Sequence, residues 1–476
     1  MSEYQINPAI PDHIFRKYDI RGIVEEDFRA NNLFTIGLAV GTIALRGRVT
    51  TLVVGRDGRV SGPELSKALI LGIIAAGCKV IDIGLVTTPM LYYAVENSEF
   101  RSGLMVSGSH NPPNYNGLKI MMFGRTWYDS DIVSIKDLIK SAKLAVPSNF
   151  SPAAYDNAAW RQVSDISANY LEFITRTVPL ARKLKIVVDC GNGAGGAFVP
   201  KLFKMMGCEV TELYCEVDGH FPNHQPDPSQ PSNMADIIPK VQELNADVGL
   251  AFDGDADRVG IVTNKGELIA ADRLLLLLAL DLLKRKPKAL VVFDVKCGRY
   301  LASEIAKAGG TPIMSPTGHS IIKATMRRMQ ADLGGELSGH IFMKERWFNF
   351  DDGIYVAARF LELLAAQDKT SSELFQAIPQ DVATPELKIP VPEANKFQIM
   401  QQILQAADFK QGKITTIDGL RVDFDFGFGL IRPSNTSPYL IACFAADTKE
   451  HLESIKAQFK TLLNKVDAAG KLGEAL

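Results

Sequence analysis

Apolar strands and helical stretches alternate in a pattern that recurs three times along the chain. Each copy has a short apolar strand, a loop, a helical stretch, a glycine and a second strand, which together are typical of a βαβ unit. The copies run from strands at 51–55, 185–189 and 289–294 to the strands that follow Gly77, Gly207 and Gly309. Because the copies begin much farther apart than the roughly 20–50 residues of a solenoid repeat, they predict three related α/β domains in tandem.

The last quarter of the chain has a different rhythm. Short apolar segments are expected to form strands at 414–417, 420–424, 430–432 and 439–444, and a helix is expected from Thr448 to about Val466. Asp418-Gly419 is a strong hairpin signal between the first two of these strands. This pattern predicts a small antiparallel α+β domain.

A chain of 476 residues is too long for one ordinary core. Proline-bearing segments at 147–152 and 379–392 favour domain boundaries. Together with the repeats they predict four domains, at 1–152, 153–258, 259–378 and 379–476. The expected fold class is α/β, with three tandem domains that contain mixed sheets and a C-terminal α+β domain.

Composition excludes several classes of protein. Hydrophobic residues make up 46% and charged residues 22% of the chain, and the formal net charge of −2 predicts no surface for nucleic acid. The first residues lack the pattern of a secretory signal, and the apolar runs are too short to span a bilayer. Six cysteines without paired metal-ligand spacing favour reduced thiols in a cytoplasmic protein.

The sequence Asp253-Gly-Asp-Ala-Asp-Arg258 places carboxylates at alternate positions before a guanidinium. Alternate carboxylates can direct their oxygens at one Mg²⁺, which often completes its coordination with phosphate oxygens. An EF-hand would need glycine and glutamate where this chain has Arg258 and Asn264. A solvated acidic turn is disfavoured because strand-like apolar residues flank the acids, and burying them without a cation is costly. This segment therefore predicts a metal site and phosphate chemistry.

A second polar loop, Ser107-Gly-Ser-His-Asn-Pro-Pro113, follows the apolar residues 104–106. Ser109 is a candidate nucleophile and the adjacent His110 a candidate proton carrier, although an ordinary polar turn explains this loop equally well. A few residues later, Lys119 is a candidate for neutralising phosphate charge or moving a proton. The alternative for Lys119 is a surface lysine.

Two further loops carry groups suited to sugars and phosphates. Gly334-Gly-Glu-Leu-Ser-Gly-His340 supplies acceptor, hydroxyl and imidazole groups for sugar hydroxyls. Arg432-Pro-Ser-Asn-Thr-Ser-Pro438 combines a guanidinium with hydroxyl, amide and main-chain donors that suit a phosphate dianion. Each loop alone could be a plain turn.

These four loops together resemble the motifs of the α-D-phosphohexomutase superfamily, in the family's order and across nearly the whole chain. Lys17-Tyr-Asp-Ile-Arg-Gly22 and Gly55-Arg-Asp-Gly-Arg59 are also similar to family sequences. Asn114-Tyr-Asn-Gly117 and the Ser-Asn-Thr of the last loop resemble the bacterial phosphomannomutase/phosphoglucomutase group most. This chain departs from frequent family residues at three positions, which are Ser107, Gly108 and Ala256. We expect these departures to adjust the geometry of the loops and to leave function intact.

The resemblance implies four domains around one central cleft, with one loop from each. It implies that Ser109 is a phosphoserine at rest and that its phosphoryl group, Asp253, Asp255 and Asp257 hold Mg²⁺. It implies that Arg258 stabilises the transferring phosphoryl group, and that His110 and Lys119 are acid/base candidates. The substrate-binding residues that it implies are Tyr18, Arg21, Lys296, His319, Glu336, Ser338, His340, Arg432, Ser434, Asn435 and Thr436.

The implied activity is interconversion of the 1-phosphate and 6-phosphate forms of mannose and glucose. A hexose 1,6-bisphosphate would be the intermediate, and glucose 1,6-bisphosphate or another hexose 1,6-bisphosphate the activator. The expected partners are hexose phosphates, without nucleic acid or membrane, and the expected state is a monomer. Three alternatives remain: a phosphoglucosamine mutase, a phosphatase with Asp253 or Asp255 as nucleophile, and a sugar-phosphate sensor without catalysis.

Overall fold

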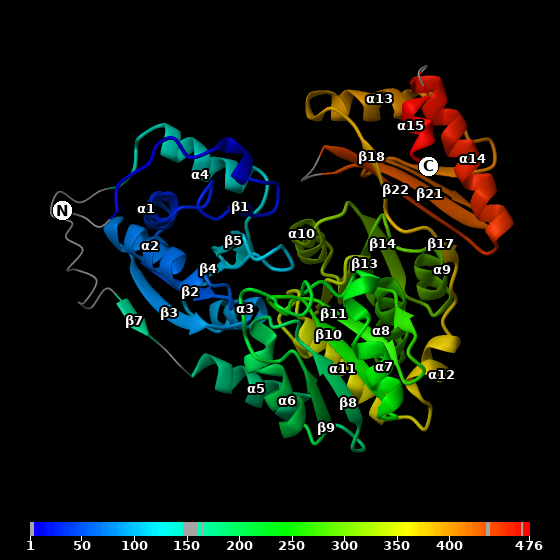
Figure 1. The fold of residues 1–476 in the computed structure, drawn as a ribbon, viewed down its shortest axis with the longest axis horizontal. Helices are drawn as coiled ribbons and strands as arrows, with labels where there is room; N and C mark the ends of the chain where they lie inside the picture. The colour runs from blue at the N-terminus through cyan, green and yellow to red at the C-terminus, as the bar shows by residue number, and fades with distance from the viewer. Residues whose placement is uncertain (1–3, 146–159, 163–164, 435–437, 468–469) are drawn as a thin grey trace. The chain divides into compact units, whose positions relative to one another are not determined.

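The structure of the chain is a computed structural model that describes residues 4–145, 160–162, 165–434, 438–467 and 470–476. Figure 1 draws the helices and strands of the chain, which divides into two compact units. The first unit comprises Met1–Ala270 and Ser338–Leu374, and the second comprises Ala271–Leu337 and Phe375–Leu476.

The first unit begins with a seven-stranded mixed sheet in the order β1-β5-β4-β2-β3-β7, with β6 paired to β5. Strands β2, β3, β4 and β7 run parallel, whereas β5 is antiparallel to both of its neighbours, β4 and β1. The strands are β1 (Ile20–Ile23), β2 (Thr51–Arg56), β3 (Lys79–Leu85), β4 (Gly103–Val106), β5 (Tyr115–Met122), β6 (Arg125–Thr126) and β7 (Trp160–Gln162). The helices are α1 (Ala30–Arg46), α2 (Gly62–Ala75), α3 (Thr88–Glu96) and α4 (Ser130–Lys140).

The second sheet of this unit has the order β12-β11-β10-β8-β9. Strands β9, β8 and β10 are parallel, and β11 turns back antiparallel beside β10. The strands are β8 (Lys185–Asp189), β9 (Glu209–Leu213), β10 (Val248–Phe252), β11 (Val259–Thr263) and β12 (Leu268–Ile269). The helices are α5 (Ile166–Thr177), α6 (Val199–Met205) and α7 (Ile237–Glu243), and β16 (Ile341–Met343), α11 (Gly353–Ala365) and α12 (Ser371–Gln376) follow later in the chain.

The second unit contains a parallel sheet around β13 and a separate antiparallel sheet. Strand β13 (Leu290–Asp294) pairs in parallel with β14 (Thr311–Ser315) and with β15 (Leu333–Gly335). The accompanying helices are α8 (Ala271–Arg285), α9 (Arg299–Lys307) and α10 (His319–Met329).

The antiparallel sheet has the order β17-β22-β21-β20-β19, with β18 also paired to β22. Its strands are β17 (Val382–Ala383), β18 (Leu387–Pro390), β19 (Lys413–Thr415), β20 (Leu420–Phe424), β21 (Gly427–Pro433) and β22 (Tyr439–Ala446). The helices α13 (Lys396–Ala406), α14 (Lys449–Val466) and α15 (Lys471–Glu474) accompany it. Apolar residues of the sheet and of α13 and α14 form one buried core, which explains the alternation seen in the sequence. Gly419 has a φ of +86° in the turn between β19 and β20, as the Asp-Gly signal predicts.

The three expected βαβ units are confirmed as β2-α2-β3, β8-α6-β9 and β13-α9-β14. In each unit the glycine before the second strand has a positive φ, of +102° at Gly77, +89° at Gly207 and +83° at Gly309. Glycine adopts this conformation without the penalty that a side chain would bring, so it ends each helix and redirects the chain. The predicted fold class is therefore correct.

The repeats also place three of the polar loops at one topological position. In each repeat a third strand, β4, β10 or β15, lies parallel to the first strand of the βαβ unit, and a polar loop follows directly. The loops are the serine loop (107–113), the aspartate loop (253–258) and the loop at 336–340. Each copy of the repeat thus carries a loop of different chemistry at the carboxyl end of the corresponding strand. In parallel sheets, ligand-binding groups commonly lie at the carboxyl ends of the strands.

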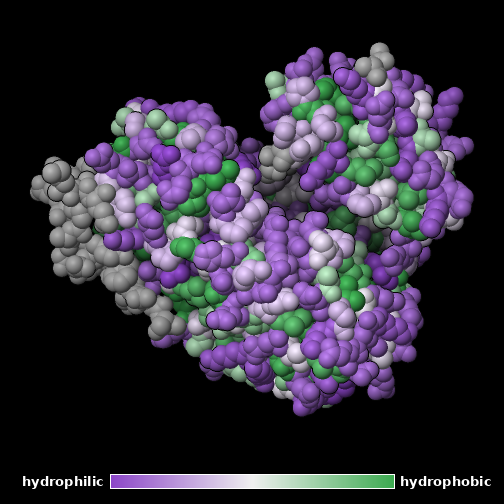
Figure 2. Space-filling model, in the orientation of Figure 1, coloured by the Kyte–Doolittle hydropathy of each residue, from purple (hydrophilic) through white to green (hydrophobic). Residues whose placement is uncertain are grey.

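Within the described residues, no helix is long and apolar enough to cross a bilayer. On the face drawn in Figure 2, hydrophobic residues are interspersed among hydrophilic ones. The six cysteines are free thiols and five of them are buried. The four domain boundaries stay a prediction, and the boundary at 152 lies outside the described residues.

Candidate active site

The aspartate loop connects β10 to β11 in the first unit, and its three carboxylates are buried. Asp253, Asp255 and Asp257 are each 0% exposed, and one oxygen from each lies within 4.8 Å of the others. The loop is closed by Ala256 N–H, which donates to Asp253 O at 3.0 Å. Ala256 has a φ of +58°, a conformation that glycine adopts most easily, so the chain accepts backbone strain at this departure from the family pattern.

Asp255 is held by hydroxyl groups from two other segments. Its Oδ2 accepts hydrogen bonds from Thr88 Oγ1 at 2.5 Å and from Ser107 Oγ at 2.9 Å. Among the described residues, Asp255 Oδ1 and Asp257 Oδ1 accept no hydrogen bond although both are buried. The loop brings three carboxylates together, and two of their buried oxygens have no hydrogen-bond donor among the described residues. These groups match the oxygen ligands that Mg²⁺ prefers. The aspartates therefore fit the ion that the sequence predicts.

Lys119 lies against the same carboxylates. Its Nζ is 2.6 Å from Asp255 Oδ2 and 2.5 Å from Asp257 Oδ2, and the residue is 3% exposed. Although burial alone would lower it, the two carboxylates raise the pKa of Lys119 well above its usual value. Burial alone would raise the pKa of Asp255, but the Lys119 ammonium group beside it holds this pKa below its usual value. The alternative of a surface lysine is therefore wrong.

Ser109 belongs to this cluster. Its Oγ donates to Asp253 Oδ2 at 2.8 Å and lies 3.1 Å from His110 Nδ1. The residue is 1% exposed and has a φ of +48°, which is uncommon for a residue with a side chain. Burial and the guanidinium of Arg258 hold the pKa of His110 well below its usual value, so this imidazole is neutral. The burial of Ser109 and its hydrogen bond to Asp253 are not features of an ordinary polar turn.

Arg59 holds the serine loop in place through its guanidinium group. Nη1 donates to Pro112 O at 2.6 Å and to Tyr115 O at 2.9 Å. Nη2 donates to Ser109 O at 2.8 Å and to Asn111 O at 2.5 Å. Arg59 is 1% exposed, so these bonds are protected from water. Four main-chain carbonyl oxygens are thus bonded to one side chain.

Gly108 is explained by the same contact. A Cβ atom at Gly108 would lie 2.4 Å from Arg59 Nε, closer than non-bonded atoms approach. The backbone N–H of Gly108 donates to Asp57 Oδ2 at 3.2 Å, and Asp57 also pairs with Arg59. Gly108 differs from the frequent family residue at this position, and its lack of a side chain leaves room for the guanidinium of Arg59.

The N-terminal candidates Arg21 and Tyr18 lie near this loop in different ways. Arg21 is 8% exposed and donates to Gly108 O at 3.4 Å, to Asn111 Oδ1, and to Asp19 Oδ2 at 2.5 Å. Tyr18 is half-buried, with Lys17 Nζ 5.9 Å from its ring centroid. The structure therefore places Arg21 in direct contact with the serine loop.

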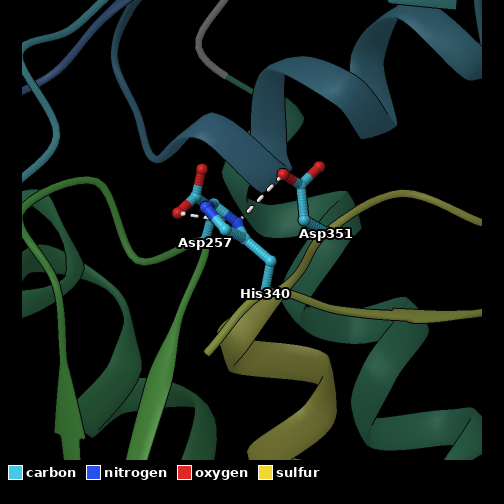
Figure 3. Close-up of side chains that lie close together, drawn as sticks. All are labelled: Asp257, His340 and Asp351. Atoms are coloured by element: carbon cyan, nitrogen blue, oxygen red, sulfur yellow. Dashed lines mark ion pairs between the residues drawn. The ribbon is translucent and has the colours of Figure 1, made fainter. Parts of the chain in front are cut away.

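Arg258 and His340 extend the cluster on the other side of the aspartates. Arg258 Nε donates to His340 Nε2 at 3.0 Å and lies 3.9 Å from Asp253 Oδ2. Figure 3 shows the His340 ring between the carboxylates of Asp257 and Asp351. Burial and Arg258 lower the pKa of His340, which favours its neutral form. Ser338, in the loop before His340, is half-buried.

In the second unit, Glu336 lies among polar groups at the end of β15. It is 2% exposed, and its Oε1 accepts a hydrogen bond from Gly318 N at 2.6 Å. Burial, followed by the charge of Asp294, raises the pKa of Glu336 to about 7, while the nearby His319 opposes this rise. Lys296 Nζ forms an ion pair with Glu386 Oε1 at 2.7 Å. Glu336, His319 and Lys296 therefore belong to one polar environment.

Arg432 lies at the end of β21 in the same unit. Its Nε donates to Asp418 Oδ2 at 3.0 Å, and the residue is 5% exposed. Ser434 is also buried, and its backbone N–H donates to Tyr439 O at 2.9 Å. Asn435 and Thr436, the other predicted phosphate ligands, lie outside the described residues.

Sequence reasoning missed Thr88, Asp351 and the role of Arg59. Thr87-Thr88-Pro89 is a helix start, because the side chain of Thr87 caps α3. That pattern predicts a helix but gives no sign that Thr88 contacts Asp255. Asp351 directly precedes Asp352, whose side chain caps α11. The capping pattern predicts a helix start but gives no sign that Asp351 contacts His340.

Comparison with known proteins gives a consistent result over the whole chain. Four models of phosphoglucomutase/phosphomannomutase domains match it: alpha/beta/alpha domain I over residues 12–145, domain II over 168–266, domain III over 270–382 and the C-terminal domain over 386–462. A phosphomannomutase/phosphoglucomutase of Pseudomonas aeruginosa is 48% identical over 462 residues, which cover 97% of this chain and 98% of that protein.

Two further relatives agree. A phosphoglucomutase of Neisseria gonorrhoeae is 47% identical over 457 residues, which cover 96% of this chain and 97% of that protein. The crystal structure of a phosphoglucomutase/phosphomannomutase family protein from Burkholderia thailandensis superposes with a TM-score of 0.90 at 40% identity, covering 97% of this chain and 98% of that one.

Proposed function

Because the chain belongs to the phosphoglucomutase/phosphomannomutase family of enzymes, we propose that it interconverts the 1-phosphate and 6-phosphate forms of glucose and mannose through a phosphoserine at Ser109. The observation that carries this proposal is the buried cluster of the first unit. There one serine hydroxyl lies 2.8 Å from a carboxylate of the aspartate loop, and that loop is also contacted by Lys119 and bordered by Arg258. A hydroxyl, a candidate metal site and two cations are the groups that phosphoryl transfer requires.

Ser109 carries the phosphoryl group in this proposal. In the first transfer the bond between Ser109 Oγ and phosphorus breaks, while a bond forms from phosphorus to the free hydroxyl of a hexose monophosphate. The acceptor hydroxyl loses its proton to a base of the site and Ser109 Oγ gains a proton, so the leaving oxygen ends as a hydroxyl. The product is a hexose 1,6-bisphosphate, which turns around and returns its other phosphoryl group to Ser109. Phosphoserine is thereby regenerated, so the two transfers balance.

Asp253, Asp255 and Asp257 would hold Mg²⁺, which when bound supplies positive charge to the phosphoryl oxygens. The chain's own cations do the remaining neutralisation. Lys119 already lies between two of the carboxylates, and Arg258 lies beside Asp253 and Asp257. Arg59 and Asp57 keep the serine loop rigid, which holds Ser109 Oγ in one position for both transfers.

Proton transfer in this proposal falls to His110 and Lys119. The neutral His110 lies 3.1 Å from Ser109 Oγ and can take or return the serine proton. Its two carboxylates hold Lys119 in the protonated form, which suits it to stabilise phosphoryl charge but makes it a weak proton donor while they are in contact. Glu336 and Ser338 would bind ring hydroxyls, and Arg432, Ser434, Asn435 and Thr436 would bind the phosphate that is not transferred.

The test is turnover of glucose 1-phosphate and mannose 1-phosphate, each activated with glucose 1,6-bisphosphate, in wild-type protein and in Ser109→Ala. We expect both sugars to react and Ser109→Ala to lose activity by at least about a thousandfold, because the covalent route is removed. Ser102→Ala is the matched control, since Ser102 is also fully buried but its Oγ accepts from Phe123 N and lies outside the cluster. It should keep activity.

Other outcomes identify the alternatives. Phosphate release that survives Ser109→Ala would indicate a phosphatase that uses Asp253 or Asp255. Faster turnover of glucosamine phosphate than of either hexose phosphate would indicate a phosphoglucosamine mutase. Binding of a hexose phosphate without turnover of any of these substrates would indicate a sensor.

A further inference from the structure

We propose that Asp351 is a positioning residue that fixes the tautomer of His340 and thereby holds the guanidinium of Arg258. This inference deepens the proposed function, because Arg258 is there assigned to the transferring phosphoryl group. Figure 3 shows Asp351 and Asp257 directed at the His340 ring from different segments. Asp351 Oδ2 lies 3.2 Å from His340 Nδ1, and Asp257 Oδ1 lies 3.6 Å from the same nitrogen.

The hydrogen bond on the other side of the ring determines the tautomer. Arg258 Nε donates to His340 Nε2 at 3.0 Å. A guanidinium group has donors and no acceptor, so His340 Nε2 must supply a lone pair. A neutral imidazole that accepts at Nε2 carries its proton at Nδ1. Asp351 is the nearer of the two carboxylates that pair with Nδ1, so it is the one that favours a proton on this nitrogen.

The backbone fixes this geometry without help from a ligand. Arg258 and His340 form an isolated antiparallel bridge, and Phe342 and Asp351 form another. A Cβ atom at Gly353 would lie 2.5 Å from the carbonyl carbon of Arg258, so the start of α11 packs directly against the main chain of Arg258. The segments that carry Asp351, His340 and Arg258 are thus locked together by main-chain contacts.

Burial makes the arrangement strongly dependent on Asp351. Asp351 is 0% exposed and His340 is 4% exposed, so water does not substitute for either partner. An asparagine at position 351 can donate to Nδ1, which favours the tautomer with its proton at Nε2. Nε2–H would then face Arg258 Nε–H, two donors would oppose each other, and the guanidinium would turn away. Loss of such an outer partner typically lowers activity about 10- to 100-fold.

A metal site is the alternative explanation for this cluster, because Asp257, His340 and Asp351 each offer an oxygen or nitrogen ligand. One ligand atom of each residue lies within 4.8 Å of the other two. The positioning role is favoured because His340 Nε2 is already bonded to Arg258 and because the guanidinium would repel a cation bound beside it. Binding of a divalent cation at these three residues would overturn the proposal.

The experiment compares Asp351→Asn with Asp352→Asn in full-length protein labelled with ¹⁵N at its histidines. Asp352 is a matched control because it is the adjacent buried carboxylate but caps α11 through Tyr355 N and accepts from Tyr170 Oη. The His340 resonances are assigned by their absence in His340→Gln. In wild-type protein we expect Nδ1 to carry the proton and Nε2 to be the acceptor.

In Asp351→Asn we expect the proton to move to Nε2 and kcat for glucose 1-phosphate to fall about 10- to 100-fold, with KM changed less than about threefold. Asp352→Asn should lower the melting temperature but keep the wild-type tautomer and kcat. A wild-type His340 with its proton at Nε2 would overturn the proposal even if Asp351→Asn failed to fold. Asp351→Asn with an unchanged tautomer and kcat would also overturn it. So would a change in the His340 ¹⁵N chemical shifts on adding Zn²⁺ to wild-type protein but not to Asp351→Asn.

The tautomer is measured without substrate, so this result is separate from the proposed function. Absence of mutase activity in wild-type protein would contradict the proposed function while leaving the tautomer assignment intact. A normal mutase whose His340 tautomer does not respond to Asp351 would contradict only this inference.

Discussion

Replacing Arg59 with lysine should loosen the serine loop while keeping the charge at this position. The guanidinium donates four hydrogen bonds through two nitrogens, to Pro112 O, Tyr115 O, Ser109 O and Asn111 O. Lysine has one nitrogen, which cannot occupy both positions, so at least two of these bonds should be lost. A net contribution of about 1.5–3 kcal/mol per bond to a charged donor gives a loss of about 3–6 kcal/mol in local stability.

Hydrogen exchange measures this loss directly. The backbone N–H groups of Gly108, Asn111 and Tyr115 close the loop by donating to Asp57 Oδ2, Gly108 O and Pro112 O. Because about 1.4 kcal/mol corresponds to a factor of ten, a loss of about 3 kcal/mol should speed their exchange at least about 100-fold. Arg46→Lys is the control, since Arg46 donates one exposed hydrogen bond, to Lys143 O at 3.1 Å, and should change exchange less than about threefold.

The same substitution should lower kcat about 10- to 100-fold, because Ser109 Oγ would no longer be held in one position. Exchange rates in Arg59→Lys within about threefold of wild type would refute the reasoning, since they would show that the guanidinium does not hold this loop. Fast exchange with unchanged kcat would refute the link between loop rigidity and catalysis.

Two further predictions concern single residues. Gly108→Ala should destabilise the protein by about 1–3 kcal/mol and lower its melting temperature, because the new Cβ would lie 2.4 Å from Arg59 Nε. Gly62→Ala is the control, since its Cβ would have no neighbour closer than 3.5 Å, and it should leave the melting temperature unchanged. Equal melting temperatures would contradict this contact. For Glu336, whose pKa is raised to about 7, kcat/KM should rise from about pH 6 to pH 8 as the carboxylate ionises and accepts sugar hydroxyls. Glu336→Gln should have a lower kcat/KM without that rise, and an unchanged pH profile in Glu336→Gln would exclude this role.

The fold was predictable because its signals are local. A glycine with positive φ ends each helix of the three βαβ units, and Asp418-Gly419 forms the expected turn between β19 and β20. Strand β20 spans the predicted residues, whereas β19 is shorter than expected and β21 begins earlier. Those ends depend on pairing with neighbouring strands, which no single segment encodes.

The site was predictable only where consecutive residues form a recognisable loop. Asp253, Asp255, Asp257 and Ser109 lie in such loops, and in the structure the hydroxyl of Ser109 donates to Asp253. Residues that act across long separations gave no local signal. The bonds of Arg59 span about fifty residues of sequence, and the contact of Thr88 with Asp255 spans 167. Such contacts depend on tertiary packing, which the pattern of one segment does not specify.

The central claim is that Ser109 carries the phosphoryl group between the two ends of a hexose phosphate. The most direct test is the intact mass of the protein before and after incubation with glucose 1,6-bisphosphate, with the added phosphate located by peptide fragmentation. We predict one phosphate on Ser109, discharged by glucose or mannose monophosphate and absent in Ser109→Ala. A phosphate on an aspartate, or no covalent phosphate while the sugar phosphates still interconvert, would contradict the account.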